Sequence, residues 1–103
     1  MDEFEVELLN PACLDLDAVS DFHMCEAGSN SARKITDKIL ASLERLKAFP
    51  LSCPLMPYRE LAEKGYRMLV CGKYICIYRF DGKMVYVHHI VPAATNYPAL
   101  FGV

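Results

Sequence analysis

The stretch YRMLVCGKYICIYRFDGKMVYVHHIV, residues 66–91, carries the clearest fold signal in the chain. Three runs within it are rich in Val, Ile, Tyr and Phe, at residues 66–71, 73–80 and 84–91. Such residues favour strands, and Gly72 and Asp81-Gly82 separate the runs. Asp-Gly between two strand-like runs is a strong hairpin signal. We therefore predict a three-stranded antiparallel meander in the last third of the chain.

A two-residue turn at Asp81-Gly82 predicts which residues of the last two strands face each other. It pairs Arg79 with Met84 and Tyr74 with His89. One face then carries Tyr74, Cys76, Tyr78, Val85, Val87 and His89, and the other carries Ile75, Ile77, Arg79, Met84, Tyr86 and His88. Both faces are largely apolar, so the pattern leaves open which one the helices cover. The remaining face is expected to be an exposed apolar docking surface.

The first half of the chain predicts one strand and two helices. Residues 4–9 alternate apolar and acidic side chains, which is typical of a half-buried strand. Asn10-Pro11 predicts a capped helix start, and Gly28 predicts that helix's end. Ser29-Asn30-Ser31 is expected to cap a second helix that Pro50 stops. Its apolar stripe is formed by Ala32, Ile35, Ile39, Leu43 and Leu46.

Residues 50–64 contain three prolines and are predicted to be a loop with a short turn at 58–63. The full order is strand, helix, helix and three strands. This order predicts an α+β fold in which a helical hairpin packs on one face of a small, mostly antiparallel sheet. With 103 residues, the chain has room for one domain, spanning residues 1–103.

The net charge of −2 hides an uneven distribution of charge along the chain. Residues 1–26 contain eight acidic and no basic side chains, whereas residues 58–103 contain six basic and three acidic ones. A weakly acidic protein is a poor candidate for bulk, non-specific nucleic-acid binding, which needs many cations. A localised basic site in the second half remains compatible with this balance.

The cysteines, the histidines and the N-terminus argue against a secreted, a membrane-spanning or a metal-binding protein. The five cysteines form no CxxC motif, and the acidic start does not look like a secretory signal, so we expect free thiols and a cytoplasmic protein. No apolar run approaches the roughly 20 residues that span a membrane. His88 and His89 are expected to point in opposite directions along a strand, and Cys13, His23 and Cys25 lack a recognised metal spacing. We predict neither a metal nor a cofactor.

Four segments of the second half carry a family resemblance: residues 61–70, 74–79, 85–87 and 97–101. With Gly65-Tyr66-Arg67 and Tyr78-Arg79 as its strongest matches, the chain resembles the RelE/ParE superfamily of toxins from bacterial type II toxin–antitoxin modules. The resemblance implies a growth-inhibiting protein that a cognate antitoxin holds in check. RelE-like members cut messenger RNA at the ribosome, whereas ParE-like members poison DNA gyrase.

The same resemblance implies the candidate site residues. Arg67 and Arg79 would hold phosphate, and His89 and Tyr97 would transfer protons, in a cut driven by the neighbouring 2′-hydroxyl. Each arginine is equally compatible with a solvated strand residue or a simple ion-pair partner, and Tyr66, Tyr74 and Tyr78 are compatible with packing.

One departure from the family pattern favours one target over the other. Where many RelE-like members place a histidine and arginines after the last strand, residues 91–96 read Val-Pro-Ala-Ala-Thr-Asn. We therefore predict gyrase inhibition first and messenger RNA cleavage second. A third hypothesis is an inert interaction module that keeps the toxin fold.

Overall fold

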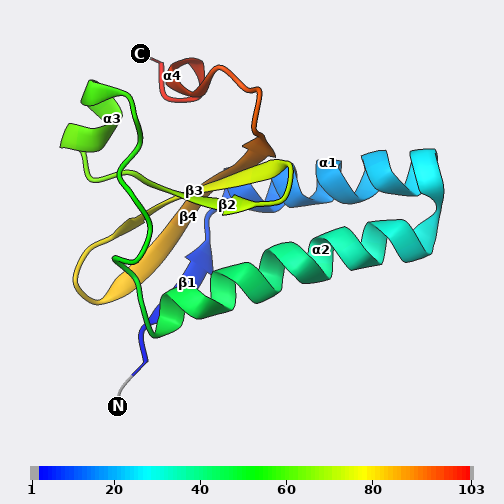
Figure 1. Cartoon of the computed structure of the whole chain (residues 1–103), viewed down its shortest axis with the longest axis horizontal. Coiled ribbons are helices and arrows are strands. Elements are labelled where there is room, and N and C mark those ends of the chain that lie inside the picture. The colour runs from blue at the N-terminus through cyan, green and yellow to red at the C-terminus, as the bar shows by residue number, and fades with distance from the viewer. Residues whose placement is uncertain (1–2, 103) are drawn as a thin grey trace.

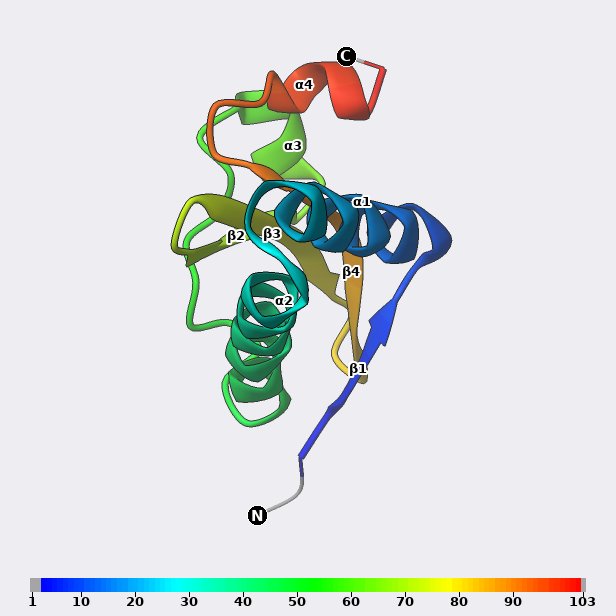
Figure 2. The ribbon, with the colours of Figure 1, turned by 90° about the vertical axis from the view of Figure 1, so that its right-hand side faces the viewer.

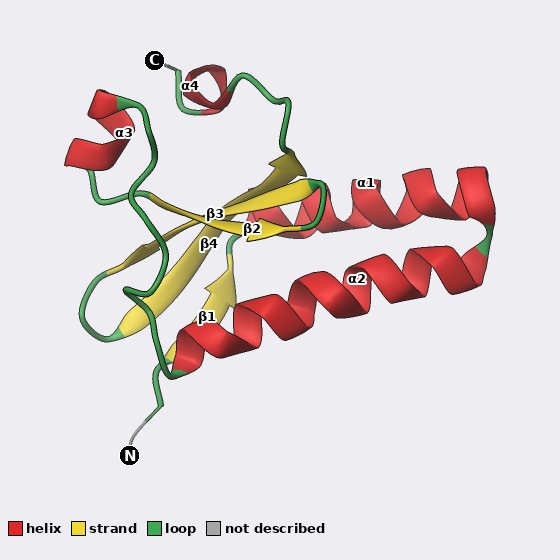
Figure 3. Ribbon diagram, viewed as in Figure 1, coloured by secondary structure: helices red, strands yellow, loops and turns green. Residues whose placement is uncertain are grey.

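The computed structural model describes residues 3–102, and Figure 3 shows their division into helices and strands. The elements in chain order are β1 (Glu5–Leu8), α1 (Asn10–Ala27), α2 (Ser29–Glu44), the 3₁₀ turn η1 (Arg45–Lys47), α3 (Arg59–Glu63), β2 (Arg67–Cys71), β3 (Tyr74–Phe80), β4 (Met84–Pro92) and α4 (Tyr97–Leu100). The predicted order of one strand, a helical pair and a three-stranded meander is therefore confirmed, with η1 and α3 added between α2 and β2 and α4 added after β4.

The four strands form one sheet in the order β1-β4-β3-β2. β1 runs parallel to β4, and the other two neighbouring pairs are antiparallel. Figure 1 shows the α1–α2 hairpin on one side of this sheet, with α3 and α4 on the other side. The α+β class and the mostly antiparallel sheet are confirmed.

The two long helices are antiparallel and meet at Gly28, whose φ of +92° suits a glycine. The predicted stripe of α2 is buried, apart from Ile35, which is partly buried. Pro11 lies in the first turn of α1 and Gly28 ends this helix, as predicted, but the predicted side-chain caps are wrong, because no side chain caps either helix. Leu9 still donates its N–H to Val87 of β4, and the chain turns from there directly into α1. No helix within residues 3–102 is long and apolar enough to cross a membrane.

The predicted register of β3 and β4 is wrong. Asp81 accepts hydrogen bonds from the backbone N–H groups of Lys83 and Met84, both at 2.8 Å, and this widens the turn. Phe80 consequently faces Val85. A bulge then inserts one extra residue in β4, because Tyr78 faces Val87 while Ile77 faces His89. Tyr74 faces Pro92 rather than the predicted His89.

The sheet has two apolar faces, and each is covered. The helix face packs Tyr74, Cys76, Tyr78, Val85, Val87 and Ile90 against α1 and α2. The opposite face packs Ile75, Ile77 and Val91 against Met56, Leu61, Tyr66 and Tyr97. Figure 2 shows α3 and α4 close together at one end of the sheet, where they cover this opposite face. The expectation of an exposed apolar sheet face is therefore wrong.

Candidate functional site

The candidate site lies on the opposite face, around Arg79 of β3. Successive residues of a strand point to opposite faces, and Tyr78 lies in the core of the helix face. Arg79 therefore points to the opposite face, where its guanidinium carbon lies 4.6 Å from the centre of the Tyr66 ring. This cation–π contact holds the positive charge in a fixed place beside the sheet.

His88 is the second member of the site. Its Nε2 accepts a hydrogen bond of 3.3 Å from Nε of Arg79. Burial, the charge of Arg79 and the nearby His89 together lower the pKa of His88 to about 4. A neutral ring fits this arrangement, since only an unprotonated Nε2 can accept from a guanidinium. His88 is therefore an uncharged acceptor at neutral pH.

Aromatic rings surround His88. The Tyr66 ring meets it edge-on at 5.0 Å between centroids, and the Phe101 ring lies 4.4 Å from that of Tyr66. Gly65, with φ of +85°, makes the turn from α3 that brings Tyr66 to this place. The rings shield part of the Arg79–His88 bond from water, and this burial is the largest cause of the lowered pKa of His88.

His89 is anchored to α1. Its Nδ1 lies 2.9 Å from Oδ2 of Asp15, and the same oxygen accepts the backbone N–H of Ile90 at 3.0 Å. The ring also meets Phe101 edge-on at 5.4 Å. Asp15 thereby fixes the bulge of β4, and the two neighbouring histidines are held by different partners.

Arg67 is not part of the Arg79 cluster. It faces Tyr78 across the β2–β3 ladder and therefore shares the helix face with it. Its Nη1 donates a 2.6 Å hydrogen bond to the carbonyl oxygen of Cys53. Arg67 and Arg79 consequently lie on opposite faces of the sheet, and Arg67 holds the loop before α3.

The contacts of Tyr97 also indicate a structural role. Its hydroxyl donates a hydrogen bond to the carbonyl oxygen of Ala93, and its ring lies 6.0 Å from that of Tyr58. Burial, and secondarily Tyr58, raises the pKa of the Tyr97 hydroxyl above its ordinary value. A hydroxyl held in this way locks the segment after β4 onto the opposite face.

The four site residues predicted from the sequence therefore do not form one cluster. They are Arg67, Arg79, His89 and Tyr97. Arg79 is instead grouped with His88 and with Tyr66, neither of which was among the four predicted site residues. Arg79 also lines a shallow cavity of about 420 Å³ together with Lys64 and Tyr86. The cavity places two cations together, but the Asp81 carboxylate also lines it and would oppose an anion there. Within residues 3–102, no group of His, Cys, Asp or Glu side chains is arranged to hold a metal ion.

Comparison with known proteins gives a consistent result. The model of the family described as "ParE toxin of type II toxin-antitoxin system, parDE" matches residues 6–97. A solved chromosomal ParDE system from P. aeruginosa is similar over 87% of this chain and 96% of that chain, with a TM-score of 0.74 and 21% identity. A chain of the toxin–antitoxin complex RelBE2 from Mycobacterium tuberculosis is similar over 87% and 98%, with a TM-score of 0.65 and 20% identity. At these identities the two structures show the shared fold alone. No curated protein sequence matches the chain.

Proposed function

Because the chain belongs to the ParE toxin family of type II toxin–antitoxin systems, we propose that it arrests bacterial growth by inhibiting DNA gyrase, and that a cognate antitoxin neutralises it. The chain has the fold shared by ParDE and RelBE toxin–antitoxin structures. Growth inhibition and antitoxin binding follow from membership of the family. The choice of gyrase depends on the separation of the two arginines.

A nuclease of the RelE type needs several cations around one phosphate, because negative charge develops on that phosphate during the cut. Arg67 and Arg79 lie on opposite faces of the sheet. Residues 91–96 contribute no cation, and the Tyr97 hydroxyl donates to a backbone carbonyl. This placement disfavours cleavage chemistry and leaves inhibition by binding, which is the ParE-like activity, as the function that the site supports best.

The experiment compares two activities of the purified chain. We expect it to inhibit supercoiling of relaxed plasmid by DNA gyrase, while transcripts in a translating extract stay intact. Adding the antitoxin encoded beside the toxin gene should restore supercoiling. Intact supercoiling at a toxin concentration that stops growth would overturn the gyrase assignment. A chain that leaves growth unaffected would support the inert module instead.

Messenger RNA cleavage is the second candidate, and the cavity shared by Lys64 and Arg79 favours it. If the chain cuts transcripts, Arg79→Ala should reduce the rate by about 10²-fold or more, as expected when a charge that stabilises the transition state is removed. Arg33→Ala is the matched control, because Arg33 is exposed on α2. Equal cleavage by both variants would exclude the Arg79 cavity as the nuclease site.

A further inference from the structure

A second hollow region lies at the far end of the sheet from the β3–β4 turn, between α1 and the β2–β3 hairpin. Two adjoining cavities, of about 310 and 570 Å³, share Phe22, Tyr74 and Pro92 as lining residues. We call these two cavities together the Phe22 groove. The backbone N–H of Ala93 donates a 2.9 Å hydrogen bond to the Lys73 carbonyl, and this bond fixes the chain after β4 against the hairpin. The groove is therefore formed by elements that hold one another in place.

The groove is apolar and open. Phe22 lies three residues after Val19 on α1. Val19 is buried, yet 58% of the surface of Phe22 is exposed. Figure 1 shows α1 and α2 extending beyond the sheet at this end, so that no strand covers the last turns of α1 and the first turns of α2. A large aromatic side chain beside two cavities costs solvation free energy in the free protein and would gain it in a complex.

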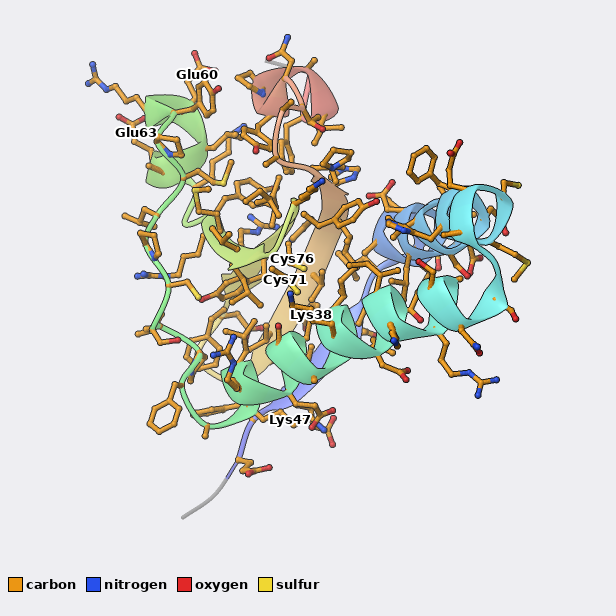
Figure 4. The ribbon with its side chains drawn as sticks, turned by 45° about the vertical axis from the view of Figure 1, so that its right-hand side comes forward. Lys38, Lys47, Glu60, Glu63, Cys71 and Cys76 are labelled. Carbon is orange, nitrogen blue, oxygen red and sulfur yellow. The ribbon has the colours of Figure 1, made fainter. Side chains whose placement is uncertain are left out.

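One end of the groove is positively charged. Lys38 and Lys73 both line the larger cavity and are exposed. Figure 4 shows Lys38 pointing from α2 toward the strands, and its Nζ lies 3.5 Å from the position that a Cβ on Gly72 would take. Among residues 3–102, neither lysine forms an ion pair. Beside them, His23 Nε2 and the Tyr74 hydroxyl share a hydrogen bond of 2.9 Å.

The other end of the groove does not balance this charge. Asp15 lines the smaller cavity, but its carboxylate already bonds His89 and the backbone N–H of Ile90. The groove thus combines an apolar centre with two unmatched ammonium groups at one end. Its complement is a segment that carries a large apolar side chain and one or two carboxylates about a helical turn away.

We propose that the Phe22 groove anchors the antitoxin, and that the antitoxin places a large apolar side chain against Phe22, Tyr74 and Pro92 and carboxylates beside Lys38 and Lys73. This inference rests on the proposed function, which supplies the partner. The antitoxin is preferred over a second copy of the chain because the free lysines call for an acidic segment.

The test measures the affinity of the toxin for the antitoxin encoded beside its gene. Phe22→Ser and the double variant Lys38→Glu/Lys73→Glu should each weaken binding by about 10- to 100-fold, as truncation of a well-buried interface anchor does. Leu14→Ser and Lys34→Glu are the matched controls, because both residues are exposed on the same helices outside the lining of the groove. Each control should change the affinity less than twofold. All of these side chains are exposed, and circular dichroism verifies that each variant folds.

A charge swap gives a second, independent readout. An antitoxin in which the contacting acidic residue is replaced by lysine should bind the double variant more tightly than it binds the wild-type toxin. Equal binding by the wild type, the Phe22→Ser variant and the double variant would overturn the groove and leave the antitoxin partner intact. Failure of the wild-type toxin to bind the antitoxin would overturn the partner and the groove together. Self-association that Phe22→Ser abolishes would assign the groove to a second copy and also overturn the proposal.

Discussion

The two faces of the sheet are covered in different ways. The helix face lies under α1 and α2, of 18 and 16 residues, and its central side chains, Cys76, Tyr78, Val85 and Val87, are completely buried. The opposite face lies under α3 and α4, of five and four residues. Met68, Leu100 and Phe101 there are only partly buried. Long helices cover the centre of one face, whereas short segments leave several apolar side chains of the other face partly exposed.

This difference separates the fully buried side chains of the helix face from a partly exposed polar cluster on the opposite face. Burial of apolar surface is the main favourable term in the free energy of folding, so the fully buried side chains of the helix face contribute strongly to it. The opposite face holds a partly exposed cation and a neutral histidine, Arg79 of β3 and His88 of β4, joined by a hydrogen bond. Substitution of a fully buried residue on the helix face should therefore cost much stability, whereas substitution of a partly buried residue on the opposite face should cost less.

The largest expected effect is that of Ile39→Ala. Ile39 of α2 is fully buried on the helix face, so its truncation leaves a cavity and should lower the free energy of unfolding by about 2–5 kcal/mol. Leu100→Ala removes a side chain of α4 that is only partly buried, and it should cost about 1 kcal/mol or less. Urea unfolding followed by circular dichroism measures both. Equal losses would contradict the division of roles between the two faces.

A smaller effect is expected from removing one hydroxyl on each face. The Tyr78 hydroxyl is buried and donates a 2.9 Å hydrogen bond to the Pro50 carbonyl. Tyr78→Phe leaves that carbonyl without this donor and should lower stability by about 1–1.5 kcal/mol. Tyr97→Phe removes a bond in a less buried place and should lower it by about 0.5 kcal/mol. A larger loss for Tyr97→Phe, measured in the same unfolding assay, would mean that α4 contributes more stability than its exposure suggests.

The elements of the fold were predictable from local patterns in the sequence. The stripe of α2 and the β-rich runs around Tyr78 depend on side-chain periodicity, which a single sequence displays. The register of β4 was not predictable, because two backbone bonds to Asp81 widen the turn and a bulge at His88 shifts the ladder. Neither effect changes the hydrophobic pattern, so the pattern could not reveal them.

The candidate site was predictable only in part, for the same reason. The motif residues Arg67 and Arg79 are equally visible in the sequence. The strand register decides which face of the sheet each one points to, and it puts them on opposite faces. The tandem histidines were a usable signal, since two polar side chains in an apolar strand call for partners. The identity of those partners, Asp15 for His89 and Arg79 for His88, depends on contacts across 74 and nine residues of chain.

The smallest expected effect is a pH dependence that belongs to the opposite face. The unfolded chain protonates His88 near its ordinary pKa of 6.5, whereas the folded chain resists protonation until about pH 4. Between these values the unfolded state binds more protons, so the free energy of unfolding should fall as the pH falls from 6.5 to 4 and stay unaffected by His88 above that window. Solvent screening limits the loss, because His88 is only half-buried.

His88→Gln isolates this contribution. Glutamine keeps an acceptor for Arg79 but takes up no proton in this range, and His23, His89 and the carboxylates remain the same in both proteins. Urea unfolding at half-unit steps from pH 4 to pH 8 should therefore give two curves that are parallel above pH 7 and separate below pH 6.5, with the wild type losing more. Curves that stay parallel down to pH 4 would mean that water reaches His88 freely. In that case the rings of Tyr66 and Phe101 would not shield the Arg79–His88 bond, and the opposite face would be still more loosely covered than its contacts indicate.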